Sequence, residues 1–340
     1  MATIANAWVQ VHPSFIEPEL IVAYNQMSGA FDTLPNSEPR VKIGEGDLAV
    51  YAKRIDVRTR VGAAQAAFNS LPSCTVVNQM IGTATYLQRV RAEYDHHDTA
   101  AAAGWGYSIV EAQRLGMRQG HFQLMRNALL YGYNPANGEG LLNAQGATAV
   151  SLPADSNGND TIVTYDSGQL AFFLTQQLGL LKQRTNQLGI GRKFTFLMPQ
   201  RVGAQIEYAD IVQLMQFQRE GAGTMTTAGT VKKIAMDNGD EITWGYDDTL
   251  QGKGAGGTDA ILIVMPEVAN PQGRNVNTNE FAKLAPGLDA CTLMYADMAA
   301  PREIPVPMPG GTIDVTSEIR VTPGWGVRPE AIVIISAQYQ

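Results

Sequence analysis

The chain has 340 residues, of which 45% are hydrophobic and 17% charged, and its formal net charge is −7. This length and hydrophobic content are enough for a sizeable core in one large or two intertwined domains. The negative charge argues against tight, sequence-independent binding of nucleic acid, which needs a surplus of Lys and Arg on one face. Charged residues fall below the roughly one quarter of a typical soluble domain, so we expect another copy of the chain to cover part of the surface.

Cysteine usage and the N-terminal residues indicate where the chain is made. Only Cys74 and Cys291 are present, far apart, which predicts neither a disulfide framework nor a CxxC metal pair. No basic region followed by an apolar one begins the sequence, and no stretch approaches the roughly 18 apolar residues of a membrane span. We therefore expect a soluble chain in a reducing cytoplasm, without a signal peptide or a membrane partner.

Spaced prolines predict an extended arm over residues 1–50. They are Pro13, Pro18, Pro35 and Pro39. Repeated prolines prevent a long helix and favour extended backbone. Such an arm has little core of its own, so we expect it to lie on the rest of the chain or on a neighbouring copy.

Two stretches with imperfect alternation of apolar and polar residues, 48–62 and 85–94, predict strands with one polar face. They flank a segment rich in Ala, Gly and Asn, and we interpret the whole as a long, protruding hairpin. An isolated hairpin is marginally stable in water, so this one needs a partner surface. Its candidate interface residues are Arg54, Arg58, Arg60, Tyr86, Arg89 and Arg91. The arginines form either a solvated strand face or a basic face that pairs with acidic residues of a neighbouring subunit.

Residues 107–131 are predicted to form a long helix. Its apolar stripe consists of Leu115, Phe122, Met125 and Leu129. Gly116 and Gly120 are four residues apart and share a side, where they would let another backbone approach closely, so both are further interface candidates. Gly132 follows the last helical residue, where a left-handed cap is expected.

The glycine-rich segment "YGYNPANGEGLLN" at 131–143 is predicted to be a helix stop and a return. In a phosphate-binding loop the glycines follow a strand and precede a helix, whereas here they follow a helix. The segment also lacks the lysine of a P-loop and the GxGxxG spacing. We interpret Asn134-Pro135 and Asn137-Gly138 as turns.

Alternating strand and helix patterns predict a compact α/β module from about 166 to 285. Its elements would be a helix at 167–189, a strand at 193–198, a helix after Pro199, a hairpin of strands 231–236 and 241–246 around Asn238-Gly239, and a strand at 259–268. Two final strands are expected at 312–321 and 330–336.

The sequence offers no convincing catalytic, cofactor-binding or metal-binding residues. His96, His97 and Asp98 are adjacent, and neighbours on a strand point to opposite faces, so they do not converge on one ion. His121 is expected to be a hydrogen-bonded core or interface histidine. No GxSxG elbow is present, and the acidic run at 237–241 lacks the spacing of an EF-hand loop. We therefore predict a protein that is not an enzyme.

The order of elements, together with three short motifs, resembles the major capsid proteins of tailed bacteriophages, the Hong Kong 97-type fold that encapsulin shells share. The motifs are "RNALLYGYNPANGEGLLNAQG" (126–146), "RKFTFLMPQRVGAQI" (192–206) and "RVTPGWGVRPEAIVII" (320–335). They look like the end of the family's spine helix, a strand and helix of its A domain, and its C-terminal strands. The resemblance covers nearly the whole chain.

The resemblance implies an α+β fold with four parts. These are an N-terminal arm (1–50), an extended E-loop hairpin (51–97), a P domain (98–165 and 286–340) and an α/β A domain (166–285). The helix at 107–131 would be the long spine helix of the P domain. The A domain would cluster around the five- and six-fold axes of a shell.

The function implied is that of a major capsid protein, a structural protein of the virion. It would self-assemble through pentamers and hexamers into an icosahedral shell around the double-stranded DNA of a tailed bacteriophage, within the host cytoplasm. Its partners would be other copies of itself, a portal and a separate scaffolding protein, with a decoration protein left open. It would enclose DNA without sequence-specific binding.

Two alternatives stay open at this point. An encapsulin-type compartment would have the same fold but enclose a cargo enzyme, and the sequence does not separate it decisively from a virus capsid. An α/β metabolic enzyme would require a convergent polar pocket and a small oligomer, and no residue pattern favours it.

Overall fold

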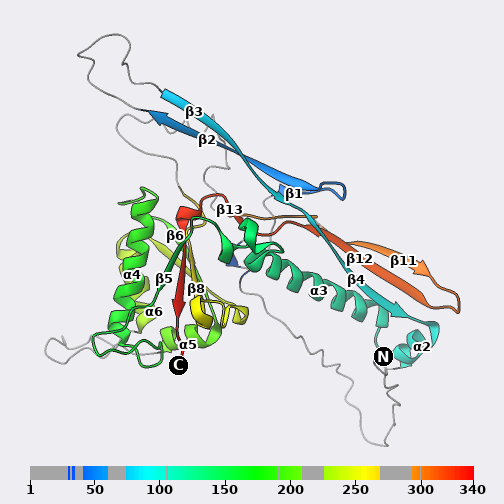
Figure 1. The fold of residues 1–340 in the computed structure, drawn as a ribbon. Helices are drawn as coiled ribbons and strands as arrows, with labels where there is room; N and C mark the ends of the chain where they lie inside the picture. The colour runs from blue at the N-terminus through cyan, green and yellow to red at the C-terminus, as the bar shows by residue number, and fades with distance from the viewer. Residues whose placement is uncertain are drawn as a thin grey trace, which may run out of the picture.

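The computed structural model describes most of the chain, and Figure 1 shows the arrangement of its elements. The described residues are 30, 33–34, 41–59, 74–104, 106–189, 191–208, 226–268, 293–298 and 300–340. The α-helices are α2 (His96–Gly104), α3 (Ile109–Tyr131), α4 (Ser167–Arg184), α5 (Gln200–Tyr208) and α6 (Thr227–Asp237). The strands are β1 (Val41–Lys42), β2 (Ala49–Thr59), β3 (Cys74–Ala84), β4 (Tyr86–Tyr94), β5 (Thr148–Ser151), β6 (Lys193–Met198), β7 (Glu241–Tyr246), β8 (Asp259–Val264), β9 (Leu293–Met294), β10 (Ala296–Asp297), β11 (Arg302–Pro307), β12 (Ile313–Val321), β13 (Trp325–Gly326) and β14 (Ile332–Ala337).

Three parts are visible in Figure 1. A compact block holds helices α4, α5 and α6 around a sheet, and an elongated part holds α3 beside β4, β11 and β12. The hairpin of β2 and β3 projects beyond both. The described part of the chain is therefore elongated, with the hairpin at one end.

The projecting hairpin confirms one predicted strand and corrects the other. β2 pairs with β3 over eleven residues, so the second strand lies inside the segment that the sequence pattern assigned to the connection. The predicted strand at 85–94 is β4, and it pairs antiparallel with β12 instead. The change of partner occurs at Thr85, whose N–H and hydroxyl bond the carbonyls of Leu48 and Asp47 and close the base of the hairpin.

The long helix α3 lies where the sequence pattern predicts it. Ser108 caps its N-terminus by accepting a hydrogen bond from the N–H of Glu111, and Gly132 follows its end with φ of +64°. Near the C-terminus of α3, Ala128, Leu129 and Leu130 are buried in the core. Leu115 of the predicted stripe is exposed, because the N-terminal half of α3 contacts the sheet mainly through a different side of the helix that carries Met117.

The glycine-rich segment after α3 is a helix stop and a return, as predicted. Two short 3-10 helices, η2 (Pro135–Asn137) and η3 (Leu141–Asn143), carry the chain back into the core. Gly140 has φ of +85°, and a Cβ built on it would lie 2.6 Å from the backbone nitrogen of Gly132. The segment connects a helix to a strand, which is the reverse of a phosphate-binding loop.

The compact block is built on a five-stranded mixed sheet in the order β5-β14-β8-β6-β7. One face packs against α4, α5 and α6 in a core that includes Leu174, Phe196 and Ile206. The opposite face packs against the end of α3 and η3 through Leu129, Leu262 and other apolar residues. The sheet therefore lies between the three helices on one face and the end of α3 on the other.

The predicted hairpin around Asn238-Gly239 is wrong, because residues 231–236 are helical and belong to α6. Thr226 caps this helix, and Val231 and Ala235, four residues apart, are both buried. Asn-Gly here ends the helix, and Gly239 has φ of +76°. The strand at 241–246 is confirmed as β7, but it runs parallel to β6.

Helix α4 begins as predicted and ends earlier. The carboxylate of Asp166 accepts a hydrogen bond of 2.8 Å from the N–H of Gln169. The buried stripe consists of Leu170, Leu174, Leu178 and Leu181. The helix ends at Arg184 because Asn186 adopts a left-handed φ of +57°, which leaves Leu188 exposed.

The end of the predicted N-terminal arm is tied to the same chain. β1 pairs in parallel with β10, and the N–H of Ile43 bonds the carbonyl of Asp297 at 3.0 Å. Most of the predicted arm lies outside the described residues. Within the described part of the chain, no helix has the length and apolar character needed to cross a membrane.

Candidate assembly surfaces

The predicted basic face is divided between two sheets. Arg54 and Arg58 lie on β2 in the hairpin, and Arg60 lies outside the described residues. The remaining candidates of the predicted strand lie on β4, in the sheet beside α3: Tyr86, Arg89 and Arg91. A single basic face on the hairpin is therefore wrong, while the contact of each residue with a neighbouring subunit stays a prediction.

Arg89 and Arg91 make ion pairs across β4 and β12. The Nε of Arg89 lies 2.6 Å from Oε1 of Glu318, and the Nε of Arg91 lies 2.7 Å from Oδ2 of Asp314. The hydrogen bond to Asp314 raises the pKa of Arg91 further above its usual range. Both arginine side chains stay more than half exposed, at 63% and 57%, so they can still meet an outside group.

The hairpin carries exposed apolar side chains that the sequence pattern did not single out. Leu48, Tyr51, Val76 and Met80 are 74%, 66%, 58% and 71% exposed. The ring of Tyr51 covers Gly82, since a Cβ built on that glycine would lie 2.6 Å from Cε1 of the ring. β3 contains no charged residue and lacks clear alternation, so it resembled a loop. The residues Leu48, Tyr51, Val76 and Met80 are called the hairpin apolar surface below.

The two glycine candidates on α3 have different surroundings. A Cβ on Gly120 would touch Val90 of β4 at 3.6 Å, so this glycine faces the sheet of its own chain. A Cβ on Gly116 would meet no atom within 4 Å, and this residue is exposed. Gly116 is thus the one of the two that another backbone can approach, and that contact stays a prediction.

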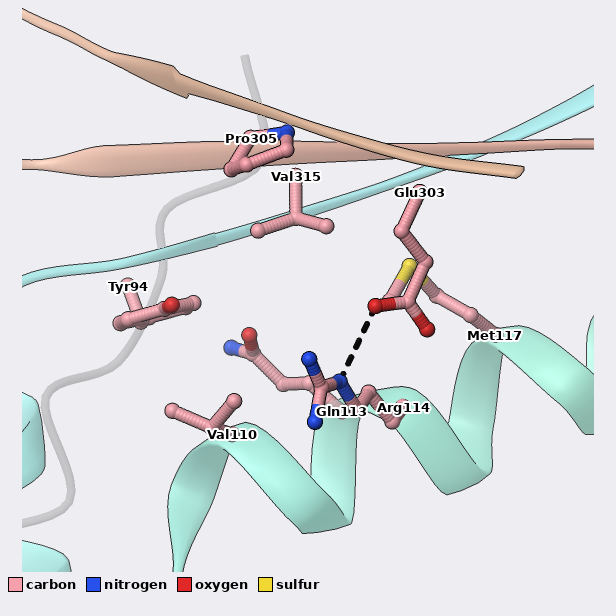
Figure 2. A pocket seen from close by; sticks show the side chains of 8 residues that line it. All are labelled: Tyr94, Val110, Gln113, Arg114, Met117, Glu303, Pro305 and Val315. Carbon is pink, nitrogen blue, oxygen red and sulfur yellow. Dashed lines mark hydrogen bonds and ion pairs between the residues drawn. The ribbon is translucent and has the colours of Figure 1, made fainter.

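The space between α3 and its sheet contains a small cavity of about 80 Å³ (Figure 2). Arg114 of α3 reaches across it to Glu303 of β11, with 3.1 Å between Nε and Oε2, and also pairs with Glu111. Val110 and Val315 supply apolar walls from the helix and from β12. The cavity is well below the roughly 300 Å³ at which small-molecule sites begin.

The buried histidine of α3 has a structural partner. His121 is 1% exposed, and its Nε2 lies 3.0 Å from the hydroxyl of Ser317 on β12. Burial lowers its pKa below the usual range, so the ring is neutral at neutral pH. His121 is therefore a core residue that joins α3 to β12, as the sequence pattern predicted.

The adjacent histidines were expected on a strand, but they lie on a helix. His96 and His97 open α2, with ring centroids 3.9 Å apart. Among the described residues, no group of three or more His, Cys, Asp or Glu side chains could hold a metal ion. Two further hollows, of about 280 Å³ beside α4 and α6 and about 250 Å³ at Arg192 and Glu241, are lined by residues with structural partners such as Lys182 and Asp240.

Comparison with solved structures finds the same arrangement in the capsids of phages and of a GTA particle. The capsid protein of Myoviridae phage XM1 superposes with a TM-score of 0.69 at 10% identity, over 95% of this chain and 96% of that chain. The capsid of an empty GTA particle gives a TM-score of 0.61 at 12% identity, over 96% of this chain and 95% of that chain. The capsid of cyanophage P-SCSP1u gives a TM-score of 0.54 at 10% identity, over 96% of this chain and 93% of that chain.

No family model and no curated protein matches the chain. Identities of 10–12% over nearly full lengths show a shared fold. The chain therefore has the α+β fold of tailed-phage capsid proteins, which confirms the fold class that the resemblance implied.

Proposed function

We propose that the chain is a major capsid protein, a subunit that self-assembles into a closed icosahedral shell. The observation that carries this proposal is the hairpin apolar surface, which projects from the body of a fold shared with phage capsids over 95% of its length. Four exposed apolar side chains on a two-stranded hairpin need cover, because such a hairpin is marginal alone. Many copies of one such contact build a closed shell by symmetry.

The roles of the parts follow from this proposal. The hairpin would be the E-loop that lies over a neighbouring subunit, α3 the spine helix of the P domain, and the sheet of β5 to β14 with its helices the A domain near the symmetry axes. Pentamers and hexamers would be the assembly units. The domain boundaries at 50, 97, 165 and 285 are part of the same proposal.

Further partners and the location belong to the proposal as well. The shell would enclose double-stranded DNA without sequence-specific binding, which agrees with a net charge of −7. A portal and a separate scaffolding protein would take part in assembly in the host cytoplasm, and the mature location would be the virion. The small cavity under α3 and the structural partners of the buried polar groups favour a structural protein over an enzyme.

The hairpin apolar surface can be tested with matched variants. Met80→Asp places a charge on it, and Met236→Asp does the same to a methionine of similar exposure, 64%, on α6. We expect Met80→Asp to raise the subunit concentration needed for assembly by at least tenfold, while both variants keep the melting temperature of the free subunit. Equal effects of the two variants on assembly would refute the special role of the hairpin.

The contents of the particles distinguish a virus capsid from an encapsulin-type compartment. Particles isolated from the natural source are expected to hold double-stranded DNA, detected by nuclease-resistant staining and sequencing. A single co-purifying enzyme in place of DNA would favour the compartment.

A further inference from the structure

Beside α3 the sheet runs in the order β11-β12-β4, and prolines block the outer side of β11. The N–H of Met308 bonds the carbonyl of Thr312, which closes the turn between β11 and β12. In an antiparallel pair, the backbone N–H and C=O groups of successive residues point alternately toward and away from the partner strand. On β11 the groups that point toward β12 are therefore those of Arg302, Ile304 and Val306. The outward positions are then held by Glu303, Pro305 and Pro307. Two of three outward donors are missing, so this edge cannot accept a full additional strand.

The same alternation fixes the direction of the backbone groups on β4. Positions 314, 316 and 318 of β12 face β11, so the odd positions of β12 face β4. Their partners on β4 are the even positions from 86 to 94. The outward N–H and C=O groups of β4 therefore belong to Leu87, Arg89, Arg91 and Glu93.

The outer edge of β4 has no strand beside it among the described residues. In that part of the chain β4 pairs only with β12. The side-chain amide of Gln113 donates a hydrogen bond of 3.0 Å to one outward group, the carbonyl of Glu93. The outward N–H groups of the four residues have no backbone partner within the described part of the chain. An unpaired edge strand of this length can pair with another chain, and natural sheets normally block such an edge.

We propose that the outer edge of β4 binds an extended strand of a second copy of this chain. The chemistry of the edge, a row of alternating backbone donors and acceptors, recognises extended polypeptide. The sequence blocks one edge of the sheet with two prolines, whereas the nine residues of β4 have no strand on their outer side in the part of the chain that the structure describes, which points to a use for β4. This inference rests on the proposed function, because a shell brings copies of the chain together.

Charge favours a copy of this chain as the partner. The exposed face of β4 carries Arg89, Arg91 and Glu93, and each arginine stays more than half exposed beside its acidic partner on β12, Glu318 or Asp314, in a chain with net charge −7. A strand placed beside β4 would set its side chains directly opposite these two arginines, where acidic residues stabilise the pair. The opposite face of β4 is closed by α3, since Gln88 is buried and Val90 meets Gly120. The new strand would therefore add to the edge without displacing α3.

Hydrogen exchange on the assembled, purified chain tests the proposal directly. Electron-transfer fragmentation resolves individual amides, so the outward amides of Leu87, Arg89, Arg91 and Glu93 can be compared with the inward amides of Gln88 and Val90. We expect the outward amides to exchange at least 100-fold more slowly in particles than in free subunits. The inward amides, already in the ladder with β12, serve as the internal control and should be protected in both states.

Proline substitution tests the same groups by removing one donor. Arg89→Pro deletes an outward N–H and leaves the inward ladder, as Pro305 and Pro307 do on β11. Arg89→Ala is the matched control, since it also loses the ion pair with Glu318 but keeps the N–H. We expect Arg89→Pro to raise the subunit concentration needed for assembly at least tenfold above that of Arg89→Ala. If Arg89→Pro does not fold, the exchange experiment on the unaltered chain decides.

The outcomes separate this inference from the proposed function. Particles that form while the outward amides exchange as in free subunits overturn the edge proposal alone. Protection that occurs only when another protein is added to the particles overturns the choice of a second copy. Absence of any assembly overturns both the proposed function and the edge proposal that rests on it.

Discussion

The hydroxyl of Tyr86 donates to both carboxylate oxygens of Glu139, at 2.9 and 3.1 Å. Tyr86 is the first residue of β4, and Glu139 lies in the turn after α3. The same carboxylate accepts the N–H groups of Tyr133 and Asn134, at 3.2 and 2.8 Å, and is 7% exposed. One buried carboxylate therefore fixes the point where the hairpin leaves the body against the end of the long helix.

Replacing Glu139 with Gln should destabilise the subunit. The substitution turns one of the two side-chain oxygens into an NH₂ group, which meets the donors that now bond the carboxylate. Loss of a charged acceptor for buried donors costs about 1–3 kcal/mol in the free energy of unfolding. Urea denaturation of the free subunit measures this, and Tyr86→Phe, which loses only the hydroxyl, should cost less. A Glu139→Gln variant as stable as the original chain would contradict this role of the carboxylate.

Gly140 should be far more sensitive to substitution than a glycine of similar conformation elsewhere. Gly140→Ala adds a Cβ at 2.6 Å from the backbone nitrogen of Gly132, whereas Gly158, with φ of +86°, would meet no atom within 4 Å. Both substitutions carry the conformational cost of a left-handed residue, about 1 kcal/mol, and only the first adds a backbone clash. We expect Gly140→Ala to unfold the subunit at a temperature at least 10 °C lower than Gly158→Ala, as measured by circular dichroism. Equal melting temperatures would show that the turn can relax.

The ion pair of Lys182 and Asp240 should contribute strongly to stability. Nζ lies 2.8 and 3.0 Å from the two carboxylate oxygens, and the side chains are 9% and 5% exposed. After Lys182→Met, the carboxylate keeps, among the described residues, the hydrogen bond from the N–H of Arg192. Breaking a buried pair in this way costs about 3–5 kcal/mol.

An exposed pair nearby provides the control for that experiment. Lys193 and Glu241 are 3.4 Å apart, with side chains 73% and 65% exposed, and such pairs contribute at most about 1 kcal/mol. Urea denaturation should therefore show a much larger loss of unfolding free energy for Lys182→Met than for Lys193→Met. Similar unfolding free energies for the two would mean that burial does not govern the contribution of the pair.

Asp297 should make the stability of the subunit depend on pH. This residue is 6% exposed, and burial raises its pKa from 3.8 to about 6, opposed by a hydrogen bond from Tyr295 and by Lys42. Because the pKa is higher in the folded state, the protonated carboxyl stabilises the fold. That contribution, about 3 kcal/mol for a pKa difference of this size, is complete below pH about 4 and is lost as pH rises through 6.

The variant Asp297→Asn isolates this effect. Unfolding free energies of the two proteins, measured from pH 4 to pH 7.5, should diverge as pH rises, with the original chain losing stability relative to the variant. A difference that is constant over this range would contradict a raised pKa of Asp297.

Local patterns in the sequence were sufficient for several elements. The spacing of apolar residues predicted the starts of α3 and α4 to within two residues, because helical periodicity is a local property of the sequence. Asn238-Gly239 misled the prediction, since the same dipeptide ends a helix or turns a hairpin. Its outcome depends on the burial of Val231 and Ala235 against the sheet, which no local pattern contains.

The candidate surfaces were harder to predict than the fold. The alternation of the β4 residues is compatible with pairing to β2, as predicted, or to β12, and the observed partner β12 lies more than 200 residues away in the sequence. Glu139 lies in a glycine-rich turn where no sequence pattern marks it as a contact residue, although its four hydrogen bonds join the end of α3 to β4. Met80 and Val76 lie in a strand without charge or alternation, and their exposure is visible only in three dimensions.

Electron microscopy of the purified chain, alongside light scattering, tests the central claim most directly. The account predicts closed shells, or rings of five and six subunits, formed by this chain. A monodisperse dimer or tetramer across a wide range of buffers and protein concentrations would contradict a capsid function.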